Sequence, residues 1–398
     1  MEDRKTLIHS EIKQTLSSVS VTISDSRFKQ KHVDSIEVEV ESSVITVTDE
    51  DREVKFHLAD IELSPLTCRG LKLSPFGELN FTMQIDSSSW KTVKPQIFDT
   101  KTTSQEEWLE KVQLYHDKCF CTKCGHKLFT NHSFFKRVLP LPSDNWSAHT
   151  DMWFCHNHGG EDTDYKSISL LPKSQECFIS STYFLVRALH LSAKHLQDGT
   201  VICPRCRSKI GAKFTEKHKT VNGHVNNSED SVCKIFHQAV IFHREDLYET
   251  TDSTLVTSDE AFFAKIINEQ SHMYTSFRLI LIGEEGTKNI QCLIWLIDPK
   301  MLIFQGMASE EQCEVNLKPK SAMKLLYKCH MNGSASSSET VNSPMLDQWI
   351  KDNSVHSFQL PYTLCLNIVT SLVNSTKLLP RSQRSLNNFM LGYLRYDS

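Results

Sequence analysis

Two pairs of cysteines, each separated by two residues, carry the most specific chemistry in this 398-residue sequence. The first pair is Cys121 and Cys124, followed by Gly125, and the second pair is Cys203 and Cys206. A C-x-x-C turn places two thiolates where both reach one ion, and two such turns supply the ligands of a closed tetrahedral zinc site. Gly125 suits the left-handed backbone conformation after such a turn. The spacing therefore predicts structural zinc bound by four cysteines.

A neighbouring cysteine leaves the choice of ligands open. Cys119 stands two residues before Cys121, so the C-x-C-x-x-C run offers more than one pair. Two unrelated cysteine pairs, one of them redox-active, would produce the same spacings. A thioredoxin-like pair, however, needs a strand before it and a helix after it, whereas Phe129, Phe134 and Phe135 follow the first pair in a strand-like setting. We therefore favour zinc over redox chemistry.

The run Cys155-His156-Asn157-His158 contains a further thiol beside two imidazoles. It is either a second zinc half-site or a loop whose histidines are incidental. One cysteine and two crowded histidines do not complete a local site. An exposed thiol beside imidazoles would nevertheless be a good ligand for a metal carried by another protein. Cys155 is therefore a candidate metal ligand for a partner, with His156 as a candidate contact.

A proline-containing segment lies between the two cysteine pairs, at residues 137–146. Its prolines fix an extended chain, because the ring restricts its own φ and the conformation of the preceding residue. Such an arm either packs across its own domain or reaches into a partner, with its tryptophan as an anchor. The candidate partner contacts in this arm are Arg137, Leu139, Pro140, Leu141, Pro142 and Trp146.

Strands precede the first cysteine pair. Apolar residues alternate with polar ones in four short runs, which is typical of half-buried antiparallel strands. The alternating residues are Val19, Val21, Ile23; Ile36, Val38, Val40; Val54, Phe56, Leu58; and Leu79, Phe81, Met83, Ile85. Asp49-Glu50-Asp51 predicts a hairpin turn. We expect a β-sandwich-like or open-barrel domain here.

The elements after these strands predict an α+β protein. A helix at 105–118 has one apolar face, and polar stretches at 213–231 and 333–343 predict loops. Strands are predicted at 236–242, 279–282 and 291–296, a hairpin turn at 284–286 and a helix at 364–373. The predicted domains are an N-terminal antiparallel β domain (1–105), a central zinc-knuckle region (106–215) with an extended Pro-rich arm (137–165), and a C-terminal mixed α/β domain (216–398).

The composition excludes several classes of protein. The formal net charge is −4, so a basic surface for nucleic acid is not expected. The sequence contains neither the apolar core of a signal peptide nor a run of roughly 18 apolar residues that would span a membrane. We expect a soluble protein of the cytoplasm or nucleus, where thiols stay reduced. The 13 cysteines are an odd number, and Cys292, Cys313 and Cys329 are expected to be buried small hydrophobes.

Several short motifs, collinear mainly between residues 60 and 210, resemble the E2-binding, HECT-like ubiquitin-ligase family. The Arg-Val-Leu-Pro-Leu-Pro-Ser segment is quite specific. The matching motifs are Cys68-Arg69-Gly70-Leu71, Cys121-x-x-Cys124-Gly125, Arg137 to Ser143, Asn145-Trp146, Trp153-x-Cys155-His156, Glu176 to Ile179 with Phe184 to Val186, Val201 to Cys206, and more weakly Leu360-Pro361, Cys365 and a closing Leu-Pro-x-Ser.

That resemblance implies transfer of ubiquitin from an E2 conjugating enzyme to protein substrates. A HECT-type ligase needs a cysteine that takes ubiquitin as a thioester, and the resemblance points to Cys365 as this catalytic residue. Leu366, Ile368 and Val369 follow it at helical spacing. A buried thiol on a helix is therefore the alternative.

The resemblance also implies an inhibitory activity. In the family, the Leu-Pro-Leu-Pro arm and its following cysteine are similar to a segment that plugs the metallo-β-lactamase endonuclease of the pre-mRNA cleavage and polyadenylation machinery. Here the arm is residues 137–165, and Cys155 would ligate the zinc of that nuclease. A thiolate in this position would replace the metal-bound water that hydrolysis needs. Ligase and inhibitor thus stand as two hypotheses, beside an interaction protein whose only chemistry is structural zinc.

Overall fold

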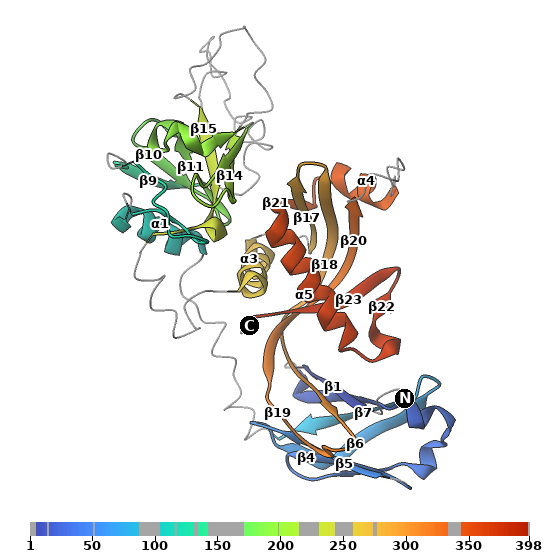
Figure 1. The fold of residues 1–398 in the computed structure, drawn as a ribbon. Coiled ribbons are helices and arrows are strands. Elements are labelled where there is room, and N and C mark those ends of the chain that lie inside the picture. Colours follow the sequence, from blue (N-terminus) through green and yellow to red (C-terminus); the bar gives the residue numbers. More distant parts are fainter. Residues whose placement is uncertain are drawn as a thin grey trace, which may run out of the picture.

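The computed structural model describes residues 5–13, 16–50, 52–86, 104–115, 118–130, 134–141, 171–197, 199–214, 231–242, 258–273, 277–332 and 344–396. The fold is mostly β. We use the names N-terminal unit for residues 5–86, central unit for 104–242 and C-terminal unit for 258–396, as far as they are described. Figure 1 shows these units in blue, in teal to yellow-green and in yellow to red, respectively.

The alternating runs of the N-terminal unit form antiparallel strands, which confirms that prediction. The strands are β1 (Thr6–Lys13), β2 (Ser18–Ser24), β3 (Glu37–Val40), β4 (Val44–Asp49), β5 (Arg52–Leu58), β6 (Leu63–Ser74) and β7 (Glu78–Ile85). β1, β2, β7 and β6 are neighbours in one sheet, and β3, β4 and β5 are neighbours in another. Side chains of both sheets, among them Val21 and Phe56, meet in one apolar core. The predicted hairpin turn joins β4 to β5, whose ends Asp49 and Arg52 are paired.

One long strand, β18 (Lys288–Ala308), runs from the C-terminal unit into the N-terminal unit (Figure 1). Its last part pairs with β1, and earlier parts pair with β17 (Arg278–Glu285) and β20 (Lys320–Asn332). β19 (Glu314–Leu317) also joins the N-terminal unit, by pairing with β5. Strand pairing therefore crosses the predicted boundary at residue 105, because strands from late in the chain complete the N-terminal sheets.

The C-terminal unit is a sheet with helices on both faces. Its other elements are α3 (Asp259–Met273), α4 (Pro344–Lys351), β21 (His356–Pro361), α5 (Tyr362–Lys377), β22 (Ser385–Leu386) and β23 (Phe389–Arg395). Leu279 and Leu281 of β17 share an apolar core with α3 and α5, whereas Ile280 shares a second core with α4. This division follows from the alternation of side chains along a strand. The β17–β18 hairpin and α5 confirm the predicted turn and the predicted helix.

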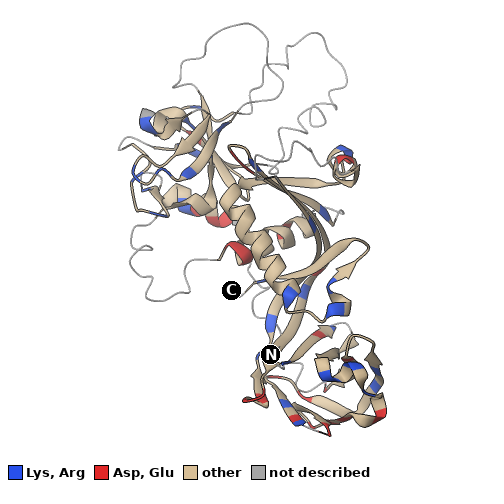
Figure 2. Ribbon diagram, turned by 45° about the vertical axis from the view of Figure 1, so that its right-hand side comes forward, with Lys and Arg blue, Asp and Glu red and all other residues tan. Residues whose placement is uncertain are grey.

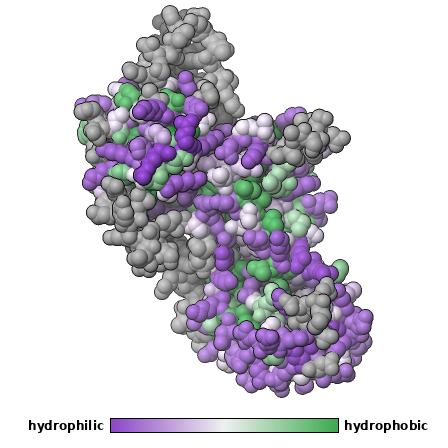
Figure 3. Space-filling view, viewed as in Figure 1, coloured by the Kyte–Doolittle hydropathy of each residue, from purple (hydrophilic) through white to green (hydrophobic). Residues whose placement is uncertain are grey.

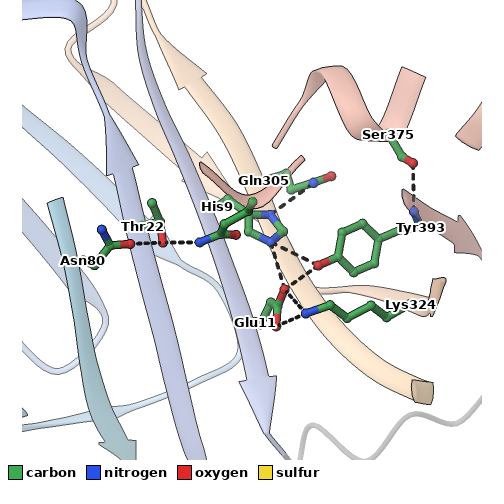
Figure 4. Close-up of polar contacts among 9 residues, drawn as sticks. His9, Glu11, Thr22, Asn80, Gln305, Lys324, Ser375 and Tyr393 are labelled. Atoms are coloured by element: carbon green, nitrogen blue, oxygen red, sulfur yellow. Dashed lines mark hydrogen bonds and ion pairs between the residues drawn. The ribbon is translucent and has the colours of Figure 1, made fainter. Parts of the chain in front are cut away.

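A buried polar cluster joins the N-terminal and C-terminal units (Figure 4). Lys324 Nζ lies 2.8 Å from Glu11 Oε1 and 2.9 Å from Glu11 Oε2, and the Tyr393 hydroxyl donates to the same carboxylate. Burial acts to raise the pKa of Glu11, but the hydrogen bond with His9 and the charge and hydrogen bond of Lys324 hold it well below its usual range. The interior therefore contains a carboxylate that is ionised because groups from both units surround it.

The central unit is built around a seven-stranded sheet with the order β12-β13-β14-β15-β11-β10-β9. Its elements are α1 (Ser104–Tyr115), β8 (Phe120–Cys121), β9 (Arg137–Pro140), β10 (Glu176–Ile179), β11 (Tyr183–Arg187), β12 (Leu196–Gln197), β13 (Thr200–Ile202), β14 (Lys209–Phe214), β15 (Val232–Phe236) and β16 (Val240–Ile241). α1 confirms the predicted helix. β15 and β16 bring residues 232–241 into this unit, so pairing also crosses the predicted boundary at residue 215.

The prediction of one strand at residues 236–242 was wrong. β15 ends at Phe236, residues His237–Ala239 form a short 3-10 turn, and β16 follows. The backbone N–H of His237 donates to the carbonyl of Thr182 at 3.1 Å. The turn allows Val240 to pair with Cys121 of β8 instead of continuing along β11. Within the turn only His237 is buried, and the apolar residues that predicted a strand, Phe236 and Val240, lie on either side of it.

The three scattered cysteines do not share one environment. Cys292 is buried, as expected, and Cys329 is partly buried. The prediction for Cys313 was wrong, because this residue is exposed. It precedes β19, and its Sγ accepts a hydrogen bond from Arg52 Nε at 3.4 Å.

Charged residues of both signs are interspersed along the described chain (Figure 2). On the face drawn in Figure 3, the N-terminal unit is mostly hydrophilic, and apolar residues gather nearer the middle of the molecule. Among the described residues, no helix has the length and apolar character to cross a membrane.

Candidate metal centre

The four cysteines of the two C-x-x-C pairs converge in the central unit. Their sulfurs all lie within 4.8 Å of one another. Cys121 Sγ lies 3.7 Å from Cys206 Sγ, and Cys124 Sγ lies 3.5 Å from Cys203 Sγ. Zn–S bonds of about 2.3 Å in a tetrahedron separate the sulfurs by about 3.8 Å, so this spacing fits an ion of that size. In the described part of the chain, this is the one group of three or more Cys, His, Asp or Glu side chains placed to hold a metal.

Both cysteine pairs adopt the same backbone turn. In each, the N–H of the first cysteine donates to the carbonyl five residues later, at 2.9 Å for Cys121 and 2.8 Å for Cys203. The N–H four residues later donates back to that cysteine, at 2.8 Å from Gly125 and 2.9 Å from Arg207. These hydrogen bonds aim both thiols of a pair to one side. The two turns, which are about eighty residues apart in the sequence, thus present matching halves of one site.

Both turns require a residue in the left-handed conformation, and the sequence revealed only one of the two. Gly125 has a φ of 64°, as expected for a glycine after the second thiol. Arg207 occupies the equivalent position with a φ of 62°. The position of Arg207 in the sequence could have predicted this conformation, because Arg207 stands four residues after Cys203, as Gly125 stands four residues after Cys121. A residue with a Cβ is strained in this region.

The pKa values of Cys203 and Cys206 are shifted in opposite directions. Burial raises the pKa of Cys203 to about 12. Burial also opposes ionisation of Cys206, but hydrogen bonds from the hydroxyl and backbone N–H of Ser208 and from the neighbouring thiols lower its pKa to about 6. Ser208 Oγ lies 3.0 Å from Cys206 Sγ. Cys206 therefore ionises more readily than Cys203, and metal binding would release the remaining protons.

The cluster brings together cysteines from two separate parts of the central unit. Cys121 belongs to β8, whereas Cys203 and Cys206 lie in the turn between β13 and β14. Arg205 Nη1 donates to the carbonyl of Cys124 at 3.2 Å, across the two turns. Cys119, the competing ligand, lies outside the group, and its side chain is buried in the apolar core. An ion bound here would hold both turns against that core.

The described part of the Pro-rich arm packs on its own unit. Arg137 to Pro140 form β9, which pairs parallel with β10. Leu141 is buried, and its N–H donates to Ile179 O at 2.6 Å. Gln105 of α1 donates to the carbonyls of both Leu141 and Ile179, at 2.7 and 2.8 Å. For residues 137–141, the alternative of internal packing therefore holds, although Arg137 and Pro140 keep exposed surfaces.

The remaining predicted residues of the arm, Pro142, Trp146, Cys155 and His156, lie outside the described residues. The described residues on either side of this gap, Leu141 and Leu171, contact the same apolar cluster. The two described residues that flank the gap therefore lie against one apolar cluster, which side chains of β11 and β15 help to form.

Cys365 lies in the first turn of α5, and its side chain has no exposed surface. Burial raises its pKa to about 12. Its Sγ packs against Gly283 so closely that a Cβ added there would lie 2.7 Å from the sulfur. A nucleophilic cysteine must reach the thioester as a thiolate. In this conformation Cys365 is protonated and covered, as in the alternative of a buried helical thiol.

Comparison with protein families assigns the class of protein. The family described as HECT-like Ubiquitin-conjugating enzyme (E2)-binding matches residues 11–391. The chain therefore belongs to this family, which confirms the resemblance seen in the short motifs. The match includes the N-terminal, central and C-terminal units.

Relatives in mammals carry a common name. The chain is 24% identical over 412 residues to E3 ubiquitin-protein ligase E3D of Mus musculus, covering 98% of each chain. It is 24% identical over 372 residues to E3 ubiquitin-protein ligase E3D of Bos taurus, covering 85% of each chain. No solved structure matches significantly. The family and its relatives associate this chain with the ubiquitin pathway.

Proposed function

We propose that this protein is an E3 ubiquitin-protein ligase that binds an E2 conjugating enzyme and promotes ubiquitin transfer to protein substrates. The observation that carries the proposal is the family match over residues 11–391, which describes E2 binding. Relatives named as E3 ligases over nearly the full length support the same reading.

Zinc is the metal that we propose for the four-cysteine cluster. Four thiolates with no open position are typical of structural rather than catalytic zinc. Cys121, Cys124, Cys203 and Cys206 would hold the ion and keep β8 against the β13–β14 turn. Zinc here would stabilise the central unit, and the chemistry of transfer would occur elsewhere.

Two routes would deliver ubiquitin. In one, Cys365 attacks the E2 thioester, forming a new thioester and freeing the E2 cysteine. In the other, a substrate lysine attacks the E2 thioester directly while the ligase orients both proteins. The buried, protonated state of Cys365 favours direct transfer. The first route would require α5 to move away from Gly283.

Discharge of an E2 charged with ubiquitin tests the proposal. Purified protein is added to the charged E2 with free lysine, and the loss of thioester is followed on non-reducing gels. We expect faster discharge with the wild type and with both Cys365→Ala and Cys313→Ala, the latter removing an exposed thiol elsewhere in the chain. No acceleration by the wild type with any E2 of a panel would contradict ligase activity. A reducible ubiquitin adduct that only Cys365→Ala abolishes would contradict direct transfer.

A second function is proposed for the segment between β9 and β10. Leu141 and Leu171, the described residues on either side of it, contact one apolar cluster. Cys155 would then ligate zinc in the endonuclease of the cleavage and polyadenylation machinery.

Cleavage of a model RNA by that nuclease should be inhibited by the wild type and by Cys68→Ala. Equal inhibition by Cys155→Ala would exclude the proposed ligand.

A further inference from the structure

Three cysteines outside the metal centre meet in the C-terminal unit. Cys292 of β18 and Cys329 of β20 are direct partners in the antiparallel pair. Opposed residues in such a pair point to the same face of the sheet. That face carries α5, and Cys365 packs in the same apolar core as the other two cysteines. The apolar interior therefore contains thiols drawn from three separate elements.

The backbone geometry of Cys292 and Cys329 is compatible with a disulfide. Opposed Cα atoms in an antiparallel pair are about 4.5 to 5.5 Å apart. A disulfide needs Cα atoms about 4.4 to 6.8 Å apart and Cβ atoms that face one another. Residues paired across two strands on one face meet both requirements, so the bond needs rotation of the side chains and little movement of the strands. Cys365 joins the cluster from α5 and has no such register with either strand.

The three thiols differ in their exposure to solvent. Cys292 and Cys365 have no exposed surface, whereas Cys329 is partly exposed. A hydrogen bond from Cys292 lowers the pKa of Cys329 against the opposing effect of burial, while the pKa of Cys292 is raised. The thiol that meets solvent is thus the one that ionises more readily. The thiol behind it retains its proton.

We propose that Cys329 and Cys292 form a site of reversible oxidation by hydroperoxides. The Cys329 thiolate attacks the peroxide, breaking its O–O bond, so that Cys329 becomes a sulfenic acid and an alcohol or water leaves. The Cys292 sulfur then attacks the Cys329 sulfur. Its proton leaves with the hydroxyl as water, and a disulfide remains. One peroxide is reduced by two electrons as two thiols are oxidised, and a thiol reductant reverses the change.

The proposed disulfide would join β18 to β20 in the strand pair that continues into the N-terminal unit. β18 pairs with β20 at one end and with β1 at the other. The oxidised protein should therefore retain its fold. The site is separate from the metal centre, whose four cysteines lie in the central unit.

Peptide mapping of the full chain tests this proposal without any substitution. The protein is treated with stoichiometric hydrogen peroxide, alkylated, and digested with trypsin under non-reducing conditions. Cys292, Cys329 and Cys365 fall in different tryptic peptides, because Lys300, Lys328 and Lys351 separate them. We expect the peptides of Cys292 and Cys329 to appear as one linked species that dithiothreitol separates. Unlinked peptides, or a link from Cys329 to Cys365 instead, would overturn it.

Variants test the order of the two steps. With Cys292→Ser, which keeps a hydroxyl donor but removes the resolving thiol, a dimedone-type probe should trap sulfenic acid on Cys329 several-fold more than in the wild type. Cys313→Ala, which removes an exposed thiol elsewhere, should leave trapping on Cys329 unchanged. Circular dichroism of each variant verifies the fold. A folded Cys292→Ser protein with no increase in trapping would contradict the assigned roles.

Discussion

Arg207 and Gly125 occupy the same position in the two cysteine turns, but the left-handed backbone conformation there strains arginine more than glycine. Both have a positive φ, and only glycine adopts it without strain. We expect Gly125→Ala to lower the stability of the metal-loaded protein by about 1 to 2 kcal/mol. At the other turn, Arg207→Gly should be more stable than Arg207→Ala by about 1 kcal/mol, because these variants differ only in the Cβ. Urea unfolding midpoints measure both effects, and equal midpoints for the two Arg207 variants would contradict the matching of the turns.

His237 makes the central unit sensitive to acid. Its ring is fully buried, stacked on Trp108 with centroids 3.9 Å apart. Burial and the nearby charge of Lys111 depress its pKa well below the ordinary value. As the pH falls below about 6.5, the unfolded chain gains a proton that the folded protein excludes, so stability is lost. Between pH 7.5 and 5.5 we expect a loss of about 1.4 kcal/mol from this residue.

The variant His237→Phe keeps the stacked ring and removes the titration. Its stability should therefore fall less between pH 7.5 and 5.5 than that of the wild type. Hydrogen exchange in the β10–β11 peptides reports the central unit directly. The exposed histidine His32, changed to Phe, provides the control, because its side chain is 80% exposed. An identical pH dependence in His237→Phe and the wild type would exclude this source of acid sensitivity.

At the scale of elements, the junction between β1, β20 and β23 depends on charge compensation. Lys324→Met leaves the Glu11 carboxylate buried with its cation removed, which we expect to cost about 3 to 5 kcal/mol. Adding Glu11→Gln should recover part of that loss, because no charge then remains unpaired. A double-mutant cycle of urea unfolding provides the measurement. Additive losses in the double variant would show that the two groups do not depend on one another.

The ionised Glu11 in the same cluster predicts that the folded protein loses stability as the pH falls. The folded pKa of Glu11 lies below its unfolded value. Its contribution is therefore present above the unfolded pKa of about 4.3 and is lost as the pH falls toward the folded pKa. Glu11→Gln should flatten the stability profile in this range. A profile at pH 3 to 5 that is the same in wild type and Glu11→Gln would contradict the compensated state.

The sequence predicted elements better than their assembly. Alternation along β2, β5 and β7 and the helical spacing of α5 are local patterns, and they identified those elements. The passage of β18 into the N-terminal unit has no local signal, since strand pairing depends on registers between distant residues. The turn at His237–Ala239 was missed because apolar residues flank it on both sides, Phe236 before it and Val240 after it. The cysteine spacings indicated the cluster, but no spacing revealed that Leu141 packs inside its own unit.

At the scale of the whole molecule, metal binding should be part of folding. The central unit has a core interrupted by two thiol turns, and an ion between them would contribute about 10 kcal/mol or more at neutral pH. A strong chelator should therefore unfold this unit and leave the N-terminal and C-terminal units protected. Hydrogen exchange before and after chelation separates the units, and circular dichroism gives the overall loss. Unchanged protection in β11 and β15 would show that the central unit folds without metal.

The metal content of purified protein tests the central claim most directly. Elemental analysis of the full chain, paired with amino-acid quantification, should find one zinc ion per chain. That ion should be lost or strongly reduced in Cys124→Ser and Cys206→Ser and retained in Cys313→Ser, whose thiol is exposed elsewhere. Folded wild-type protein without stoichiometric metal would contradict the assignment of these four cysteines, as would zinc that survives in both ligand variants.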